Sequence, residues 1–203
     1  MKPQNQQKVW DSIAPEWHEF KQIPAQHVKD FLKSQEQKGT VLDLGSGSGR
    51  NLQKIKSGEM YLVDFSQNML NLAKQKAKKL KIKIQTQKTE IFKLPYKDNF
   101  FDSSICISAL HCIKGKKNRI KSIQELYRVL KPKAQALISV WNKDSKRFKN
   151  SEKEKLIAWR NKGKRYYYLY NEQEIHKQFQ ATGFKILSTH NSEMMINFVV
   201  EKN

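Results

Sequence analysis

The chain has 203 residues, of which 38% are hydrophobic, enough for one core and scarcely for two. Its 39 Lys and Arg against 19 Asp and Glu give a formal net charge of +20, which disfavours the compact state unless a polyanion such as nucleic acid or an acidic membrane surface relieves it. The ten Phe, seven Tyr and four Trp exclude intrinsic disorder, so we expect one folded domain with an anionic partner.

The N-terminal segment MKPQNQQKV lacks the apolar stretch of a signal peptide, and no segment approaches the roughly 18 consecutive apolar residues of a membrane helix. We therefore expect a soluble, cytoplasmic protein with no membrane partner. The spacing of Cys106 and Cys112 matches neither a zinc site nor a redox pair, so we expect two reduced thiols with a packing role and no metal site.

Two short helices are expected near the N-terminus, over Gln4–Ile13 and His27–Lys33, joined by a loop around Pro15 to Pro24. From residue 40, β-rich runs alternate with helical patterns, which is typical of a parallel sheet covered by helices. The seven expected strands are Thr40–Leu44, Met60–Asp64, Ile82–Thr86, Phe101–Ser108, Gln135–Trp141, Phe184–His190 and Ile196–Glu201. The later expected helices are Gln67–Lys79, Lys117–Leu130 and Glu172–Ala181.

The last of these helices has a capping-box pattern, Asn171 with Glu174, and should stop at Gly183. Only short connections flank the sixth strand, so strands six and seven should form a hairpin that places one antiparallel strand in the sheet. The single domain 1–203 then divides into N-terminal helices (1–39), a cofactor-binding core (40–141), a basic insertion (142–165) and a closing helix with its hairpin (166–203).

The insertion at residues 142–165 carries ten basic and three acidic residues, a net charge of +7. A connection this long in a compact domain is usually functional or mobile. We expect it to contribute salt-dependent contacts with RNA phosphates.

A glycine loop forms the clearest motif, VLDLGSGSGR at residues 41–50, in which an apolar strand runs into Gly45, Gly47 and Gly49 and a helix is expected to begin. Glycines permit positive φ and let the backbone approach a nucleotide-like ligand. The dinucleotide fingerprint needs glycine at its sixth position, where Arg50 stands, so a plain NAD site is disfavoured.

Three acidic residues accompany this loop. Asp43 lies at its mouth, which suits a cationic ligand better than a pyrophosphate. Asp64 ends the second strand, where an acidic side chain can accept hydrogen bonds from both ribose hydroxyls, and Glu90 follows the third strand and could accept from an adenine amino group. Together they predict a pocket for an adenosine that carries positive charge, and S-adenosylmethionine fits that description.

The segments DLGSGSG, VDFS and FDSSICISALH resemble the motifs of class I S-adenosylmethionine-dependent methyltransferases. The resemblance implies an α/β, Rossmann-like fold with a seven-stranded sheet of order 3-2-1-4-5-7-6, the seventh strand antiparallel, and helices on both faces. It also implies S-adenosylmethionine as cofactor, with these binding residues: Asp43, Gly45, Ser46, Gly47, Gly49, Asp64, Phe65 and Glu90.

Within that superfamily the chain resembles the tRNA wobble-uridine methyltransferases that esterify carboxymethyluridine, including the domain attached to an AlkB-type hydroxylase. The similar segments are residues 9–24, 107–113, 118–141 and 165–184. His111 and Arg165 match the family pattern, and Lys21 stands where the family has Arg. The departures are Cys112 and Tyr168 in place of His, and Lys133 and Ala134 in place of glycines.

This resemblance implies tRNA as substrate, with Lys21, His111 and Arg165 orienting the substrate carboxylate or phosphates, and it suggests a small zinc-binding activator subunit as a partner. A carboxylate acceptor is ionised at neutral pH because its reference pKa is near 4, so no general base is required.

Two alternatives stay open: a methyltransferase of a small metabolite or of ribosomal RNA, and an RNA-binding module whose methyltransferase fold has lost catalysis. The net charge argues against a small metabolite, and the intact acidic residues and glycines argue against lost catalysis. The aromatic run Tyr166–Tyr170 is either a base-stacking platform or ordinary core.

Overall fold

The computed structural model describes residues 4–20 and 22–203 of the chain. Its helices are α1 (Gln6–Phe20), α2 (Gln26–Ser34), α3 (Gln67–Leu80), the short 3-10 helix η1 (Leu110–Cys112), α4 (Lys116–Val129) and α5 (Glu172–Thr182). Its strands are β1 (Lys38–Leu44), β2 (Ser57–Asp64), β3 (Ile84–Lys88), β4 (Phe101–Ile107), β5 (Leu130–Trp141), β6 (Glu154–Ala158), β7 (Lys164–Tyr168), β8 (Phe184–Thr189) and β9 (Met195–Lys202).

Seven strands form one sheet of order β3-β2-β1-β4-β5-β9-β8. The first five run parallel, whereas β9 is antiparallel both to β5 and to β8. Since β8 and β9 are the sixth and seventh predicted strands, the sequence-based fold class and strand order are confirmed. The cap at Asn171 is confirmed too, because its side chain accepts a hydrogen bond from the Glu174 N–H.

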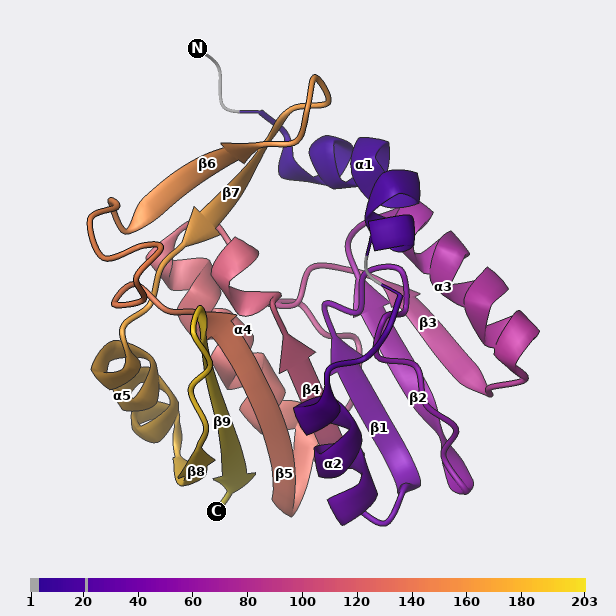
Figure 1. Cartoon of the computed structure of the whole chain (residues 1–203). Helices are drawn as coiled ribbons and strands as arrows, with labels where there is room; N and C mark the ends of the chain where they lie inside the picture. The colour runs from indigo at the N-terminus through magenta and orange to yellow at the C-terminus, as the bar shows by residue number, and fades with distance from the viewer. Residues whose placement is uncertain (1–3, 21) are drawn as a thin grey trace.

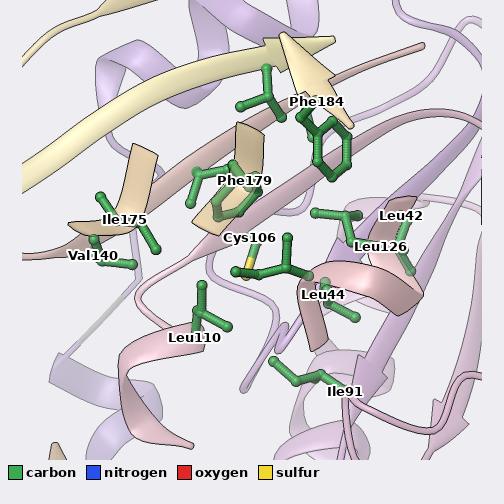
Figure 2. Packing of buried hydrophobic residues seen from close by; sticks show 14 of the residues in the cluster. Leu42, Leu44, Ile91, Cys106, Leu110, Leu126, Val140, Ile175, Phe179 and Phe184 are labelled. Atoms are coloured by element: carbon green, nitrogen blue, oxygen red, sulfur yellow. The ribbon is translucent and has the colours of Figure 1, made fainter. Parts of the chain in front are cut away.

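Helices cover both faces of the sheet because its strands carry consecutive apolar residues, whose side chains point to one face and the other in turn. Val41 of β1 faces the cluster that α2 and α3 cover, whereas Leu42 and Leu44 face the cluster under α4 and α5. Figure 1 shows α2 in front of the sheet and α4 behind it. Figure 2 shows the second cluster, with Leu126 of α4 and Phe179 of α5 among the side chains packed against the strands.

Helix α1 is longer than predicted and continues through Pro15 to Phe20. Proline has no N–H to donate to the carbonyl four residues earlier, which normally interrupts a helix. That carbonyl belongs to Asp11, and it accepts a hydrogen bond from the Asn68 side chain at 3.1 Å instead. Contact with α3 therefore satisfies the carbonyl of Asp11. The prediction of a loop from Pro15 to Pro24 is wrong as far as Phe20, where α1 ends.

The helix expected directly after the glycine loop is also wrong. Residues 45–56 form turns and irregular backbone before β2 begins at Ser57. Gly45, Gly47 and Gly49 have φ angles of +77°, +53° and +76°, which lie in the left-handed region rather than the α region. The segment between β1 and β2 is too short to hold a helix together with the chain that leads back to the start of β2. It therefore connects the two parallel strands by turns.

Strands β6 and β7 form a separate antiparallel hairpin that the sequence did not predict. The hairpin and α1 lie above the carboxyl ends of the parallel strands in Figure 1. Trp10 and Ile13 of α1 pack with Met69 of α3 and Tyr167 of β7 in one buried cluster. We call α1 and this hairpin the roof. No helix in residues 4–20 or 22–203 has the length and hydropathy to cross a membrane.

Candidate functional site

Three acidic side chains gather below the roof, where β1, β2 and β3 end. Asp43 lies near the end of β1, Asp64 ends β2, and Glu90 follows β3. Besides burial, the charge of Asp64 raises the pKa of Asp43. Burial also raises the pKa of Asp64, and the charges of Asp11 and Glu90 add to that rise. Carboxylates this close to one another favour binding of a cation.

Asp43 carries the strongest sign of a missing ligand. Its residue is 1% exposed, and neither carboxylate oxygen has a partner at full hydrogen-bond geometry within the described residues. Against the larger effect of burial, the Asn51 side chain lies close enough to lower the pKa of Asp43 a little. Burial, with the neighbouring charge of Asp64, raises the pKa of Asp43 to about 7. Because a buried carboxylate is costly unless it is paired, this side chain is suited to a cationic ligand.

Asp64 is held in place by backbone donors. Its Oδ2 accepts a hydrogen bond from the Gly47 N–H at 2.8 Å, and its Oδ1 accepts one from the Ser66 N–H at 2.9 Å. Burial raises the pKa of Asp64 to about 6, and these two hydrogen bonds limit the rise. Each carboxylate oxygen keeps a further lone pair, so the side chain can still accept hydrogen bonds from a ligand's hydroxyl groups.

The glycine loop is built for close backbone approach. The N–H groups of Gly45 and Ser46 donate to the Val63 carbonyl at 2.8 and 3.0 Å, which fixes the start of the loop against β2. A Cβ added to Gly45 would lie 2.2 Å from the Cβ of Ala109, whereas one added to Gly47 would meet nothing within 4 Å. Gly45 is therefore required for packing, and Gly47 faces open space next to Asp64.

Small polar side chains of the same loop are buried without partners. The Ser46 and Ser48 hydroxyls and the Asn51 Oδ1 make no hydrogen bond within the described residues. Buried polar atoms are normally paired, so a group of unpaired ones indicates a ligand. The site predicted from the sequence included Ser46 but missed Ser48 and Asn51. Ser48 lies between two loop glycines, and Asn51 follows the last of them by two residues.

The roof is fastened to the end of β2. Asp11 of α1 accepts hydrogen bonds from the Ser66 hydroxyl at 2.5 Å and from the Asn68 N–H at 3.2 Å. Phe65 packs against the roof cluster beside Trp10. Asp11 therefore holds α1 over the acidic side chains at the ends of β1 to β3, a role that the sequence pattern did not reveal.

His111 is buried in η1, with 1% of its surface exposed. Its Nδ1 accepts a hydrogen bond from the Trp141 N–H at 3.0 Å, so the neutral ring carries its proton on Nε2. The ring stacks on Trp141, with centroids 5.2 Å apart, and lies 5.6 Å from the Tyr167 ring. Burial lowers the pKa of His111 to about 3, so this side chain is neutral at physiological pH.

Arg165 is a buried cation in an aromatic cage. Its guanidinium lies 4.8 Å from the Trp159 ring centroid and 5.5 Å from that of Trp17, and its Nη1 donates to the Tyr167 hydroxyl at 2.6 Å. Its Nε has no hydrogen-bond partner, and it forms no ion pair within the described residues. The acidic side chain of this cluster, Glu16, pairs instead with two other cations of the hairpin. A buried cation without a counter-charge favours binding of an anion.

Cys112 connects the two charged centres. Burial raises the pKa of its thiol, the charge of Arg165 opposes that rise, and the charge of Asp64 adds to it. Both side chains therefore lie within electrostatic reach of Cys112. The site can hold a cationic ligand at its acidic end and an anionic group at Arg165, under one roof.

Lys21, which we expected beside the acceptor from the sequence, lies outside the described residues. All five residues of Tyr166–Tyr170 are buried, which favours the alternative of ordinary core over a base-stacking platform. Within the described residues, no three His, Cys, Asp or Glu side chains are grouped so that they could hold a metal ion.

A family model described as "Methyltransferase domain" matches residues 35–184. The probable tRNA methyltransferase 9B of Bos taurus is 25% identical over 159 residues, which cover 78% of this chain and 34% of that protein. The tRNA (carboxymethyluridine(34)-5-O)-methyltransferase of Arabidopsis thaliana is 31% identical over 134 residues, or 66% of this chain and 32% of that protein. The chain thus spans about a third of the length of these curated relatives.

Solved structures share the fold. A SAM-dependent methyltransferase from Methanosarcina mazei superimposes with a TM-score of 0.71 at 17% identity, and the match covers 89% of this chain and 98% of that one. At this level of identity the likeness shows the fold alone.

Proposed function

Because the chain belongs to the methyltransferase domain family, we propose that it transfers a methyl group from S-adenosylmethionine to tRNA and esterifies a carboxymethyl group on a modified wobble uridine. Family membership makes the protein an S-adenosylmethionine-dependent enzyme. The tRNA substrate and the position of methylation are the proposed part.

The residues of the acidic end suit this cofactor. In our proposal, the unpaired carboxylate of Asp43 faces the positive charge of the cofactor, and Asp64 accepts hydrogen bonds from the ribose hydroxyls. Glu90 accepts from the adenine amino group, and Gly47 leaves open space for the ligand. When bound, S-adenosylmethionine supplies a methyl group on a sulfonium, which is already an activated leaving group.

The unpaired, buried guanidinium of Arg165 is the observation that carries the acceptor proposal. A guanidinium fork binds a carboxylate through two parallel hydrogen bonds, and one of its N–H groups is already oriented by Tyr167. The surrounding tryptophans exclude water, which strengthens this interaction. Arg165 therefore holds the acceptor carboxylate and directs one of its oxygens toward the acidic end of the pocket.

Proton removal is not needed for this reaction. A carboxylate is ionised at neutral pH, so its oxygen can attack directly. His111 agrees with that chemistry, because a neutral ring whose Nδ1 accepts from Trp141 is poorly placed to act as a base. We assign it a positioning role: with Trp141 and Tyr167 it forms the wall against which the substrate lies.

Transfer to a small metabolite is the second candidate function. The net charge of +20 favours a polyanionic substrate over it, because cations that neutralise phosphates gain affinity by releasing counterions. A location in the cytoplasm and a small zinc-binding activator subunit stay predictions from the sequence.

The direct test is mass spectrometry of tRNA nucleosides from a strain that lacks the gene. We expect the methyl ester of carboxymethyluridine to disappear and the free acid to accumulate at the wobble position. Unchanged nucleosides at that position would contradict the proposed substrate.

Cofactor binding should depend on pH. In the free protein, Asp43 and Asp64 have pKa values of about 7 and about 6, so both are largely protonated at about pH 5.5. A cationic ligand binds the ionised carboxylates, so a carboxyl group that was protonated must release its proton when the ligand binds. For each proton released, the affinity rises by up to about tenfold per pH unit. We therefore expect calorimetry to show S-adenosylmethionine binding more tightly at about pH 7 than at about pH 5.5.

The control for this pH dependence is Asp43→Asn, which cannot titrate and should bind more weakly with a flatter pH profile. If the unmodified protein binds with the same affinity at both pH values, the carboxylate of Asp43 does not face the cofactor's positive charge.

A further inference from the structure

An exposed aromatic edge lies where α1 ends. Phe20 is 66% exposed and Ile23 is 71% exposed, the two highest values among the exposed large hydrophobic residues of the described chain. Trp17 and Trp159 lie beside Phe20, only partly buried. We call these four residues the aromatic edge. Exposed apolar side chains gathered in this way mark an interaction surface.

The rings of this edge form a continuous series. The Phe20 centroid lies 6.2 Å from that of Trp159 and 6.4 Å from that of Trp17, and the two tryptophans are 5.5 Å apart. A series of rings that begins at the surface and continues inward gives flat groups, such as nucleobases, several positions on which to stack.

Cations stand on both sides of the aromatic edge. On the hairpin side, Arg160 and Lys162 share the carboxylate of Glu16. On the α3 side, the Arg50 Nε donates to the Ile23 carbonyl and the Lys76 Nζ donates to the Gln22 carbonyl, both at 2.8 Å.

The two cations on the α3 side, Arg50 and Lys76, lie close together. Burial lowers the pKa of Lys76, and the charge of Arg50 lowers it further. Neither Arg50 nor Lys76 forms an ion pair within residues 4–20 and 22–203. The edge thus has two cationic flanks, and Glu16 joins the hairpin flank to α1. Positive charge on both sides of an aromatic surface suits a phosphate backbone.

The aromatic edge also leads to the acceptor site. Trp17 and Trp159 belong both to the aromatic edge and to the cage of Arg165. Each ring lies beside the guanidinium of Arg165 and also beside the ring of Phe20. A nucleotide whose carboxylate is held by Arg165 would therefore place its chain neighbour at the edge.

We propose that the aromatic edge is a single-stranded RNA subsite, on which a base adjacent to the methylated nucleotide stacks while Arg50 and Lys76 on one side and Arg160 and Lys162 on the other hold the flanking phosphates. This inference rests on the proposed function. It deepens that function by naming where the unpaired nucleotides of an anticodon loop lie.

Nucleic acid fits this surface better than a protein partner does. Protein interfaces are depleted of Lys, whereas Lys76 and Lys162 both stand beside this apolar surface, together with Arg50 and Arg160. Single-stranded RNA combines the two features, because its bases stack on aromatic side chains and its phosphates bind Lys and Arg.

The test is binding of a synthetic anticodon stem–loop with unmodified uridine at the wobble position, measured by fluorescence anisotropy. We expect Phe20→Ala to weaken binding at least about fivefold, the loss of one base–aromatic stack. Phe20→Tyr should bind as the unmodified protein does. The matched control is Leu156→Ala, which removes an equally exposed apolar side chain (62%) from β6 of the same roof, and it should leave affinity unchanged.

The inference is overturned if Phe20→Ala binds the stem–loop normally, as it would if the edge docked a protein, or if Leu156→Ala loses as much affinity. Calorimetry with S-adenosylmethionine shows that each variant is folded. Because the probe carries no carboxymethyl group, this result does not depend on ester formation. Failure of the acceptor proposal would leave the binding difference intact, and failure of the subsite would leave the ester intact.

Discussion

We expect Arg165→Ala to methylate tRNA at least about a hundredfold more slowly than the unmodified protein, while binding S-adenosylmethionine normally. The guanidinium is buried among aromatic rings without a counter-charge, so the acceptor carboxylate would lose its only charged partner within the described site. Removing one partner of a desolvated charge pair typically costs 2–5 kcal/mol, which is the basis of this magnitude. Single-turnover transfer of labelled methyl groups measures it.

Two variants make that result specific. Lys164→Ala removes a neighbouring positive charge that is exposed on the hairpin, and it should change the rate little. Arg165→Lys keeps the charge but loses the planar fork, so it should recover part of the rate at most. If Arg165→Ala and Lys164→Ala are equally active, Arg165 does not hold the acceptor.

Gly45→Ala should have the largest effect on cofactor binding. The new methyl group would lie 2.2 Å from the Cβ of Ala109, at a φ of +77° that L-residues avoid. The left-handed backbone costs about 1–2 kcal/mol and the overpacking about 1–3 kcal/mol, so we expect a loss of about 2–5 kcal/mol in the free energy of unfolding. Displacement of the loop should also weaken S-adenosylmethionine binding at least about tenfold. Urea unfolding and calorimetry measure the two effects.

Gly115→Ala separates the two causes, because Gly115 has a φ of +87° but nothing within 4 Å of the added Cβ. It should lose only the backbone part, about 1–3 kcal/mol, because its ψ of 131° places it in another sparsely populated region of positive φ. Adding Ala109→Gly to Gly45→Ala should restore the packing part. Equal stability of Gly45→Ala and Gly115→Ala would mean that the contact with Ala109 does not matter.

The main sheet was predictable because its strands are short apolar runs that end at polar or glycine residues. The errors have local physical causes. Helix α1 passes Pro15 because Asn68, distant in sequence, supplies a hydrogen bond to the Asp11 carbonyl. The hairpin β6–β7 was missed because its segment is rich in charge, and because Arg165 of β7 lies among the tryptophan rings of α1 and the hairpin rather than against an apolar strand of the main sheet.

An irregular stretch early in β5 shows how a fold tolerates a poor local residue. Lys133, where the resembling family has glycine, adopts a φ of +64° inside β5, next to an irregularity in its pairing with β4. The neighbouring strands fix this conformation at the cost of local strain.

The acidic end of the candidate site was more predictable than the end at Arg165. Asp43, Asp64 and the loop glycines belong to one contiguous motif and the strand that follows it, so spacing alone places them together. The cage of Arg165 joins Trp10 and Trp17 of α1 to Trp159 of the hairpin, and only the tertiary structure brings these residues into contact. The sequence signal for this end was the match of Arg165 to the pattern of the resembling family.

The central claim is that this protein forms a methyl ester on tRNA. Its most direct test is to incubate the purified protein with methyl-labelled S-adenosylmethionine and a tRNA whose wobble uridine carries a carboxymethyl group, and then to treat the product with mild alkali. An ester releases its label as volatile methanol under these conditions, and we predict that nearly all label on the tRNA is released in this way. Label that stays on the tRNA after alkali would contradict the claim and would indicate methylation of a base or a ribose.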